Sequence, residues 1–214
     1  MNQNLLYVIL CVAAYLIGSI PTSVWIGKCF YGIDVREHGS GNAGTTNTIR
    51  ILGTKPGIIV FAIDVLKGFL AVCLTHFTQF EQGTAAFVNM QLILGVCAVM
   101  GHIFPIYARF KGGKGVATLL GIAIALSPLA ALICFCVFAI VLTISKYVSL
   151  SSMIAGLTFP ILIIAVFQIR IPSLIVFSIL ESVLLIITHR KNIIRLLHHE
   201  ENRFSFKKKN NQQA

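Results

Sequence analysis

The stretch VATLLGIAIALSPLAALICFCVFAIVLTIS, residues 116–145, decides how many times this chain can cross a membrane. It contains no charged side chain, and about 20 apolar residues suffice to cross the hydrocarbon core as a helix. A run of about 30 such residues is too long for one comfortable span and short for two. Ser127 and Pro128 stand at its middle, where proline favours a turn. We therefore expect a hairpin of two short spans, residues 115–127 and 129–145.

Composition places the rest of the chain in the same class. Of its 214 residues, 57% are hydrophobic and 11% are charged, and the mean hydropathy is +0.87. So little polar surface cannot cover a soluble domain, which excludes the ordinary soluble class. Five further spans are expected, at residues 5–26, 57–78, 84–107, 151–168 and 173–189. The predicted fold is an all-α integral membrane protein of about seven transmembrane helices. It forms one domain, 1–204, followed by a basic tail, 205–214, for which we expect disorder.

The distribution of Lys and Arg predicts the orientation of these spans. With seven spans and the N-terminus outside, 15 of the 17 Lys and Arg residues fall on the cytoplasmic side, as the positive-inside rule requires. Arg170 stays outside and Lys67 lies within a span. With six spans, Lys146 and the basic C-terminus would lie on the far side, so we prefer seven, with a cytoplasmic C-terminus. The net charge of +10 is then explained by topology and membrane lipids, and no nucleic-acid partner is expected.

Three polar stretches reach the same cytoplasmic face in this topology. The first is HGSGNAGTTNTIR, residues 38–50, between the first two spans. Ser40, Thr46 and Asn47 offer hydrogen-bonding groups, and Arg50 offers a bidentate fork for phosphate. A solvated, capped turn is the alternative, but the density of Gly, Ser, Thr and Asn ending in Arg favours ligand binding.

The second stretch is GHIFPIYARFKGGKGVAT, residues 101–118. Lys111 and Lys114 flank Gly112 and Gly113 at the start of the fourth span, where backbone N–H groups and an ammonium together predict an anion-binding cradle. The stretch is not a Walker A loop, because Gly rather than Ser or Thr follows Lys114. His102 is interpreted as a structural hydrogen-bonding residue.

The third stretch is THRKNIIRLLHHEENRF, residues 188–204. His189 and Asn192 lie three apart and share a face if the helix continues. Glu201 can extend this polar edge, and the apolar residues between predict an amphipathic interfacial helix. The adjacent residues of the His-His-Glu run at 198–200 point about 100° apart on a helix, so no metal site is expected.

Three ionisable residues lie inside predicted spans. Asp64 and Lys67, at i and i+3, can neutralise each other, either as a structural ion pair or as part of a functional interior. Glu181 has no local partner. It is either protonated or paired with Lys67 from another helix, and both alternatives stay open.

Taken together, SGNAGTTNTIR, GHIFPIYARFKGGKGVAT and HRKNIIRLL resemble the three signature motifs of the PlsY family, the bacterial acyl-phosphate:glycerol-3-phosphate acyltransferases. The resemblance covers residues 1–204, with the motifs in the family's order. It implies a seven-helix enzyme of the bacterial cytoplasmic membrane with its active site on the cytoplasmic side. The implied substrates are acyl phosphate and sn-glycerol 3-phosphate, and the products are lysophosphatidic acid and phosphate. No cofactor, metal or obligate protein partner is implied.

The resemblance also assigns site residues. Ser40, His189 and Asn192 take the catalytic positions. The substrate-binding positions are Arg50 and Lys114, with Thr46, Asn47 and Glu201 in support. The predicted anion-binding cradle adds Lys111, Gly112 and Gly113 as candidate phosphate-binding residues. Lys191 departs from the family, which usually has Glu there. A transporter of a phosphorylated small molecule is the main alternative, and a non-catalytic scaffold is a third, although it would not need the glycine-cation loops.

Overall fold

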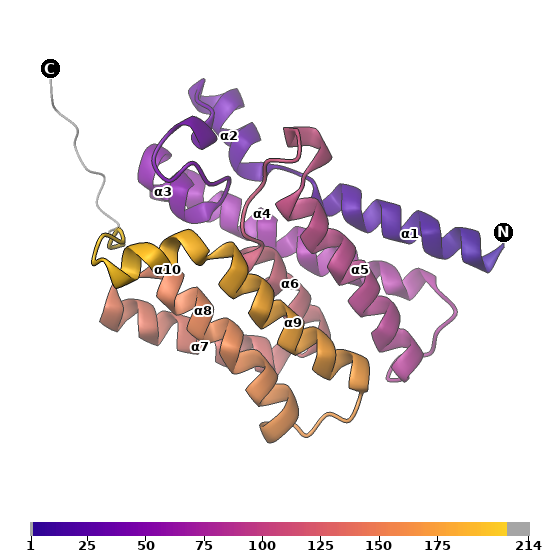
Figure 1. Ribbon diagram of the computed structural model, residues 1–214. Coiled ribbons are helices and arrows are strands. Elements are labelled where there is room, and N and C mark those ends of the chain that lie inside the picture. Colours follow the sequence, from indigo (N-terminus) through magenta and orange to yellow (C-terminus); the bar gives the residue numbers. More distant parts are fainter. Residues whose placement is uncertain (1, 205–214) are drawn as a thin grey trace, which may run out of the picture.

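The computed structural model describes residues 2–204, and within that range every regular element is a helix (Figure 1). The tail for which the sequence predicts disorder, 205–214, lies outside the described residues. The α-helices are α1 Gln3–Gly18, α2 Thr22–Tyr31, α3 Thr45–Leu52, α4 Thr54–Cys73, α5 Ala85–Ile103, α6 Val116–Leu126, α7 Pro128–Ser145, α8 Val148–Ile161, α9 Pro172–Thr188 and α10 Arg190–Leu197. Short 3-10 turns, η1 Val35–Glu37, η2 Leu74–Phe77 and η3 Ile106–Ala108, and a π turn, η4 Leu162–Val166, complete the set.

The predicted division of residues 116–145 into two helices is confirmed, whereas a membrane crossing by each of them stays a prediction. α6 ends at Leu126, and α7 begins at Pro128, which occupies the first turn of that helix. Proline is well accommodated there because its missing N–H would have no partner in the helix anyway. The other predicted spans correspond to α1 with α2, α4 with η2, α5, α8 with η4, and α9.

Length limits how many of these helices can cross a bilayer alone. Within residues 2–204, four have the length and composition to do so: Thr54–Phe77, Ala85–Ala108, Pro128–Ser145 and Val148–Val166. Counting the bent pairs α1–α2 and α9–α10 as one span each raises the number to six. α6 has 11 residues, about 16 Å at 1.5 Å per residue, and is too short to cross the core alone. The chain is thus an integral membrane protein, and the exact number of seven spans stays a prediction.

The first predicted span, 5–26, is not one continuous helix. It breaks after α1, and α2 restarts beyond Pro21 with a bend of 44°. The break leaves the Ile20 carbonyl without a helical partner, and Lys67 Nζ donates to it at 2.9 Å. Lys67 also pairs with Asp64 at 2.8 Å, as the i, i+3 spacing predicts, and Thr22 Oγ1 donates to Asp64 at 3.0 Å. The ion pair therefore holds a helix break in place as well as neutralising itself.

Glu181 does not meet Lys67. The Lys67 ammonium is taken by Asp64 and Ile20, while Glu181 is buried on α9 and its Oε2 has no hydrogen-bond partner among residues 2–204. This finding excludes the predicted alternative of a Lys67–Glu181 pair.

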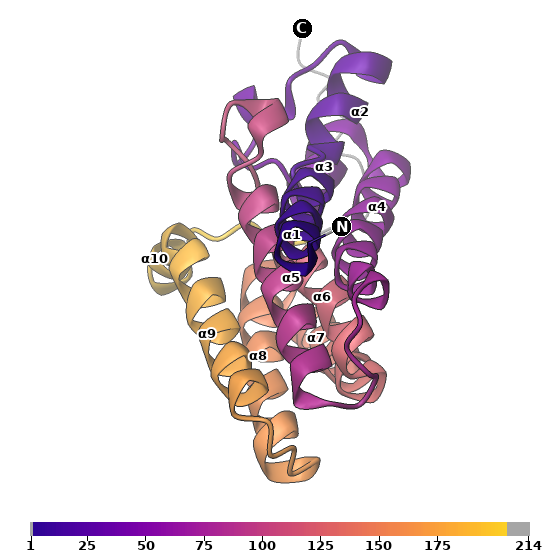
Figure 2. The same cartoon turned by 90° about the vertical axis from the view of Figure 1, so that its right-hand side faces the viewer.

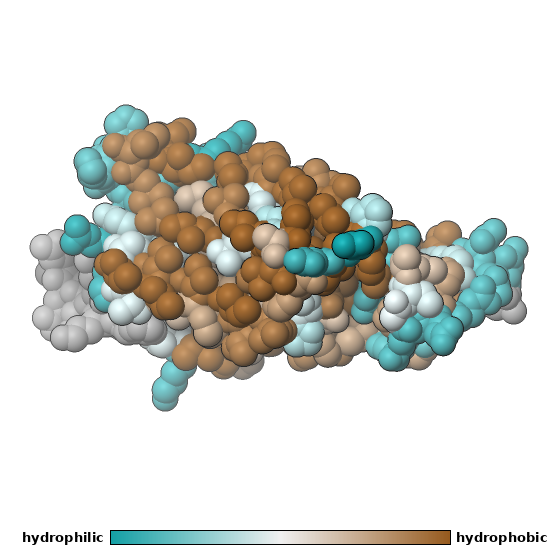
Figure 3. Space-filling view, turned by 90° about the horizontal axis from the view of Figure 1, so that it is seen from below, coloured by the Kyte–Doolittle hydropathy of each residue, from teal (hydrophilic) through white to brown (hydrophobic). Residues whose placement is uncertain are grey.

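The helices form a bundle with its polar stretches at one end. Figures 1 and 2 show α1, α4 and α5 on one side and α7, α8 and α9 on the other, with α6 between them. The α2–α3 segment, the α5–α6 loop and α10 lie at the same end in Figure 1. Figure 3 shows apolar side chains over most of the middle of the displayed face, with hydrophilic residues toward its ends, as a lipid-facing surface requires.

Glycines allow two pairs of helices to approach closely. A Cβ at Gly68 of α4 would overlap the Thr118 carbonyl of α6, and one at Gly121 of α6 would overlap the Val65 carbonyl of α4. The same reciprocal arrangement joins α1 and α5. Small residues at helix crossings are the usual device in membranes, where packing rather than hydrophobic transfer holds helices together. The close crossing of α4 and α6 fixes the position of the first turns of α6, and therefore the position at which the α5–α6 loop must end.

Replacing Gly121 by Val should destabilise the folded protein, because the branched side chain forces α6 away from α4. We expect a loss of about 1–3 kcal/mol or more, the usual cost of overpacking, measured as a lower thermal unfolding midpoint of the purified protein. Leu66→Val is the control, since Leu66 lies on α4 and is 51% exposed. Equal midpoints for the two variants would contradict the close crossing.

Candidate active site

A cavity of 680 Å³ opens at the end of the bundle where the three polar stretches meet. Its lining includes residues of each stretch: Ser40, Thr46, Asn47 and Arg50 of the first, Gly112, Gly113 and Lys114 of the second, and His189, Asn192 and Glu201 of the third. Ten of the eleven predicted site residues therefore lie around one space. Lys111 is the exception, because its side chain is exposed and it is not among the residues that line the cavity. Its predicted role in substrate binding stays a prediction.

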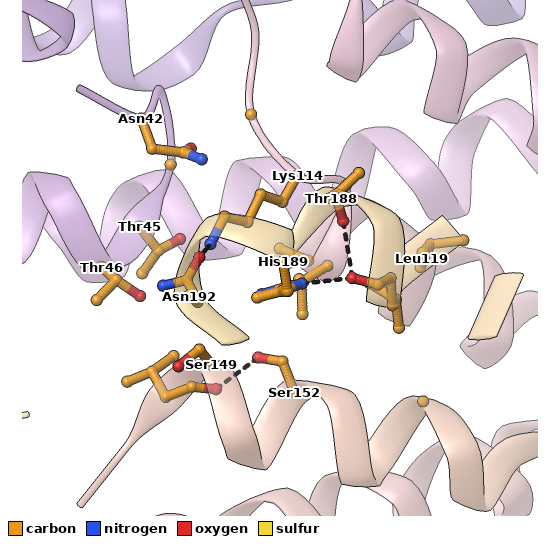
Figure 4. A pocket seen from close by; sticks show the side chains of 18 of the residues that line it. Asn42, Thr45, Thr46, Lys114, Leu119, Ser149, Ser152, Thr188, His189 and Asn192 are labelled. Carbon is orange, nitrogen blue, oxygen red and sulfur yellow. Dashed lines mark hydrogen bonds between the residues drawn. The ribbon is translucent and has the colours of Figure 1, made fainter. Parts of the chain in front are cut away.

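Lys114 and Asn192 join two of the stretches directly. The Lys114 ammonium donates to Oδ1 of Asn192, and Figure 4 shows Lys114 reaching from the α5–α6 loop to this residue of α10. Asn192 in turn donates through Nδ2 to Glu201 Oε1 at 2.6 Å. The amide side chain thus lies between a cation and a carboxylate, and its orientation is fixed by both.

Glu201 organises this side of the cavity. Besides Asn192, its Oε1 accepts from Ser149 Oγ of α8 at 2.8 Å, and its Oε2 accepts from Arg195 Nε at 2.7 Å. Burial alone would raise the pKa of the Glu201 carboxyl, but the hydrogen bonds from Arg195, Asn192 and Ser149 outweigh burial and lower it below its ordinary value. The Glu201 carboxylate thus accepts hydrogen bonds from Ser149, Asn192 and Arg195, and it ties these three side chains together at the cavity lining.

The Lys114 ammonium lies in a partly buried, cation-rich setting. Burial lowers the pKa of Lys114 to about 8, with Glu201 acting in the opposite direction and the nearby cations Arg195 and Arg50 lowering the pKa further. The ammonium is therefore charged at neutral pH and is lost as the pH rises through about 8. A cation partly withdrawn from water, with Arg50 close by, is suited to bind a phosphate group.

His189 presents one ring nitrogen to the cavity. Its Nδ1 donates to the Leu185 carbonyl at 2.8 Å, because a carbonyl can only accept, and this bond leaves Nε2 without a proton in the neutral ring. The imidazole is thus buried, and its neutral ring is held in the tautomer that can accept a proton from a bound hydroxyl.

The first stretch is shaped from within by Asn47. Its Nδ2 donates to the carbonyls of Val35, at 2.7 Å, and His38, at 3.1 Å, while its Oδ1 accepts from the Ser40 backbone N–H at 2.9 Å. The buried amide is therefore committed to folding the loop. Ser40 and Arg50 are exposed at the cavity lining, where they remain accessible to a ligand.

The two glycines of the second stretch differ from the sequence prediction. Gly112 N–H donates to the Ile103 carbonyl at 3.1 Å and Gly113 N–H to the His102 carbonyl at 3.2 Å, so neither amide is free for an anion. A Cβ at either position would overlap the end of α5, which explains why glycine is needed there. The Gly112 and Gly113 amides are therefore not part of the predicted cradle: these glycines seat the loop on α5 and deliver Lys114 to the cavity.

Two functional residues escaped the sequence analysis. Ser149 holds Glu201, but in the sequence it is one of several serines at the start of an apolar span. Arg36, which was counted only as a topology signal, pairs with Asp34 at 2.7 Å and donates to the Ala108 carbonyl at 2.8 Å, so it joins the segment just before the first stretch to the second stretch. A single sequence carries no signal for either contact, since both partners are distant along the chain.

Away from the polar mouth the cavity becomes apolar. It continues between α6, α7, α8 and α9, where its lining residues are Leu119, Leu120, Ala123, Cys134, Phe135, Phe138, Ala155, Gly156, Phe159 and Leu185, with Glu181 among them. One space therefore offers cations and hydrogen-bonding groups at its mouth and hydrocarbon surface inside.

Comparison with known proteins identifies relatives of this chain that are described as glycerol-3-phosphate acyltransferases. The family model for glycerol-3-phosphate acyltransferase matches residues 8–199. Curated proteins of that name include one from Chlorobaculum tepidum, 41% identical and covering 96% of this chain and 100% of its own, and one from Listeria monocytogenes, 45% identical, covering 91% and 94%. The crystal structure of PlsY, an integral membrane glycerol 3-phosphate acyltransferase, in its glycerol 3-phosphate form is 38% identical, with a TM-score of 0.82 over 93% of this chain and 96% of that one. A second PlsY structure, the lysophosphatidic acid form, has a TM-score of 0.80 at 36% identity, over 94% of this chain and 96% of that one. The chain therefore belongs to the glycerol-3-phosphate acyltransferase family and is an integral membrane enzyme of the PlsY kind.

Proposed function

We propose that the enzyme transfers a fatty acyl group from acyl phosphate to the 1-hydroxyl of sn-glycerol 3-phosphate, giving lysophosphatidic acid and inorganic phosphate. The observation that carries this proposal is the two-part cavity, whose cationic mouth suits phosphate groups and whose apolar interior suits an acyl chain. Membership of an acyltransferase family removes the support for a transporter or a scaffold.

The reaction follows from the groups at the mouth. The glycerol oxygen attacks the acyl carbonyl carbon, a new C–O bond forms, and the bond from that carbon to the phosphate oxygen breaks. Phosphate leaves with the electron pair, and the hydroxyl proton passes to the phosphate or to Nε2 of His189. Since acyl phosphate is already activated, holding the two groups in attack geometry can supply about 7–11 kcal/mol of the barrier.

Each side chain is proposed to act according to its position. Arg50 and Lys114 bind phosphate groups, and Ser40 and Asn192 orient the substrates. His189 positions the attacking hydroxyl. Glu201 positions Asn192 and Lys114 through the contacts described above. Thr46 remains a predicted substrate contact at the cavity lining.

The mouth of the cavity is proposed to face the cytoplasm of a bacterial cell, across its cytoplasmic membrane. Support comes from the distribution of Lys and Arg, which gather in the segments at this end of the bundle. Glycerol 3-phosphate is then supplied from water and the acyl donor from the lipid phase, without a protein partner or a cofactor.

The donor can be identified with purified protein in lipid vesicles. Palmitoyl phosphate and glycerol 3-phosphate should give lysophosphatidic acid and phosphate in equal amounts, whereas palmitoyl-CoA should give no product. Lys114→Ala in the same vesicles is the control, because it removes the buried cation. Transfer from palmitoyl-CoA at the rate seen with palmitoyl phosphate would disprove the proposed donor and leave the family membership intact.

Lys114 should set the alkaline limit of the reaction. Because its pKa is lowered to about 8, the ammonium is present below that pH and lost above it. In the free enzyme, kcat/KM for glycerol 3-phosphate should therefore fall about tenfold per pH unit above pH 8. Lys114→Arg should remove this decline, since guanidinium stays charged. Lys111→Arg is the matched control outside the cavity and should keep the wild-type profile; a decline that survives in Lys114→Arg would argue against the assignment.

His189 should contribute through its neutral ring. The hydrogen bond from Nδ1 to the Leu185 carbonyl leaves Nε2 as the proton acceptor of the neutral ring, a group that glutamine lacks. His189→Gln should lower kcat at pH 7 by about 100-fold or more, the usual size of a proton-transfer contribution. The exposed His76, replaced by Gln, serves as control. A kcat within twofold of wild type in His189→Gln would rule out this role.

A further inference from the structure

The apolar part of the cavity ends on one residue from each of four helices. Ala123 of α6, Cys134 of α7, Phe159 of α8 and Glu181 of α9 are, on their helices, the lining residues farthest from the polar mouth. All four are buried. Three of these floor residues are apolar, and the fourth carries a carboxyl group.

The carboxyl of Glu181 is not used by the fold. Glu181 is 7% exposed, and its Oε2 has no hydrogen-bond partner in the part of the chain that the structure describes. The nearest hydroxyls on α9 are committed elsewhere, since Ser178 donates to the Ile175 carbonyl and Ser182 to the Gly156 carbonyl. A buried polar group without a partner is costly. Oε2 is sealed from solvent, whereas Oε1 has no hydrogen-bond partner among the described residues either but keeps accessible area, so Oε1 is the oxygen that water in the cavity can hydrate.

The position of Glu181 determines which acyl chains reach it. It lies eight residues before His189, the residue that caps α9, which is about 12 Å along a helix. An extended alkyl chain advances about 1.25 Å per carbon, because its bonds of about 1.5 Å alternate in direction, so about ten carbons cover that distance. An octanoyl chain that starts near His189 therefore ends short of the floor. A palmitoyl chain is long enough to reach it.

We propose that Glu181 is the residue that determines acyl-chain specificity, by opposing burial of the distal half of a long saturated chain. This inference rests on the proposed function, because it takes the apolar part of the cavity to be the acyl site. A long chain that enters the floor displaces water from the carboxyl and offers no hydrogen bond in return. The chain itself gains little, because lipid tails are as apolar as the cavity wall. A floor that holds the chain weakly also eases release of the product into the bilayer, a step that limits many enzymes.

Steady-state kinetics with two donors of different length test the proposal. For each variant, the quantity to compare is the ratio of KM for palmitoyl phosphate to KM for octanoyl phosphate, measured in the same vesicles so that partitioning into lipid cancels between variants. Glu181→Leu should lower this ratio about tenfold, the change expected from removing the desolvation of one polar group. KM for glycerol 3-phosphate should stay at its wild-type value in Glu181→Leu.

Two controls separate polarity from other effects. Glu181→Gln keeps a polar group of the same size at the floor and should keep the wild-type ratio. Ser178→Ala removes a buried hydroxyl from the same helix outside the cavity lining and should also keep it. An unchanged ratio in Glu181→Leu, or an equal change in Glu181→Gln, would overturn the proposal. If Glu181→Leu does not fold, Glu181→Met removes the carboxyl with a more adaptable side chain.

A binding measurement keeps this inference apart from the choice of donor. The ratio of Kd for 1-palmitoyl to 1-octanoyl glycerol 3-phosphate should fall about tenfold in Glu181→Leu, with slower dissociation of the palmitoyl form. If wild-type protein uses neither acyl phosphate but this ratio changes, the proposed donor is wrong and the role of Glu181 stands. If both donors are used and neither ratio changes, the proposed function stands and the role of Glu181 is wrong.

Discussion

The site depends on one constraint. The partly buried ammonium of Lys114 needs hydrogen-bond acceptors, and those acceptors must in turn be fixed by further hydrogen bonds. Lys114 donates to Asn192, Asn192 donates to Glu201, and Glu201 also accepts from Ser149 and Arg195. The chain of contacts joins the α5–α6 loop, α8, α10 and the segment after α10. A buried polar network with unpaired members is less stable than an apolar core. Folding must therefore bring all of these elements into contact for the network to be stable.

Close helix packing fixes the positions of the elements that carry this hydrogen-bond network. The glycines at the α4–α6 crossing set the start of α6, and the glycines before Lys114 seat its loop on the end of α5. The break between α1 and α2 is held by Lys67 and Asp64 of α4. Lys67 and Asp64, which lie within a predicted span, therefore fix the position of α2, which leads into the polar stretches at the mouth of the cavity.

Local rules predicted those parts of the structure that depend on neighbours in sequence. The turn at Ser127-Pro128, the Asp64–Lys67 pair and the grouping of three polar stretches follow from proline chemistry, helical spacing and charge distribution. The direction of the Gly112 and Gly113 amides depends on how the loop folds back on the end of α5, and no local rule predicts that path. The contact of Ser149 with Glu201 depends on a segment 52 residues away in the chain. Sequence named the residues at the mouth, but packing decides which of them face a ligand and which face the protein.

Under the proposed function, the cavity serves two substrates from different solvents. Glycerol 3-phosphate comes from water and is best held by charge, whereas an acyl chain comes from lipid and gains little by entering an apolar wall. Charge at the mouth can therefore supply most of the affinity, and the apolar part needs only to guide the chain past Leu119, Gly156 and Leu185. A floor that bound the chain strongly would retain a product that has to return to the bilayer. The unpartnered carboxyl of Glu181 at that floor is consistent with a site built to release a lipid as well as to make one.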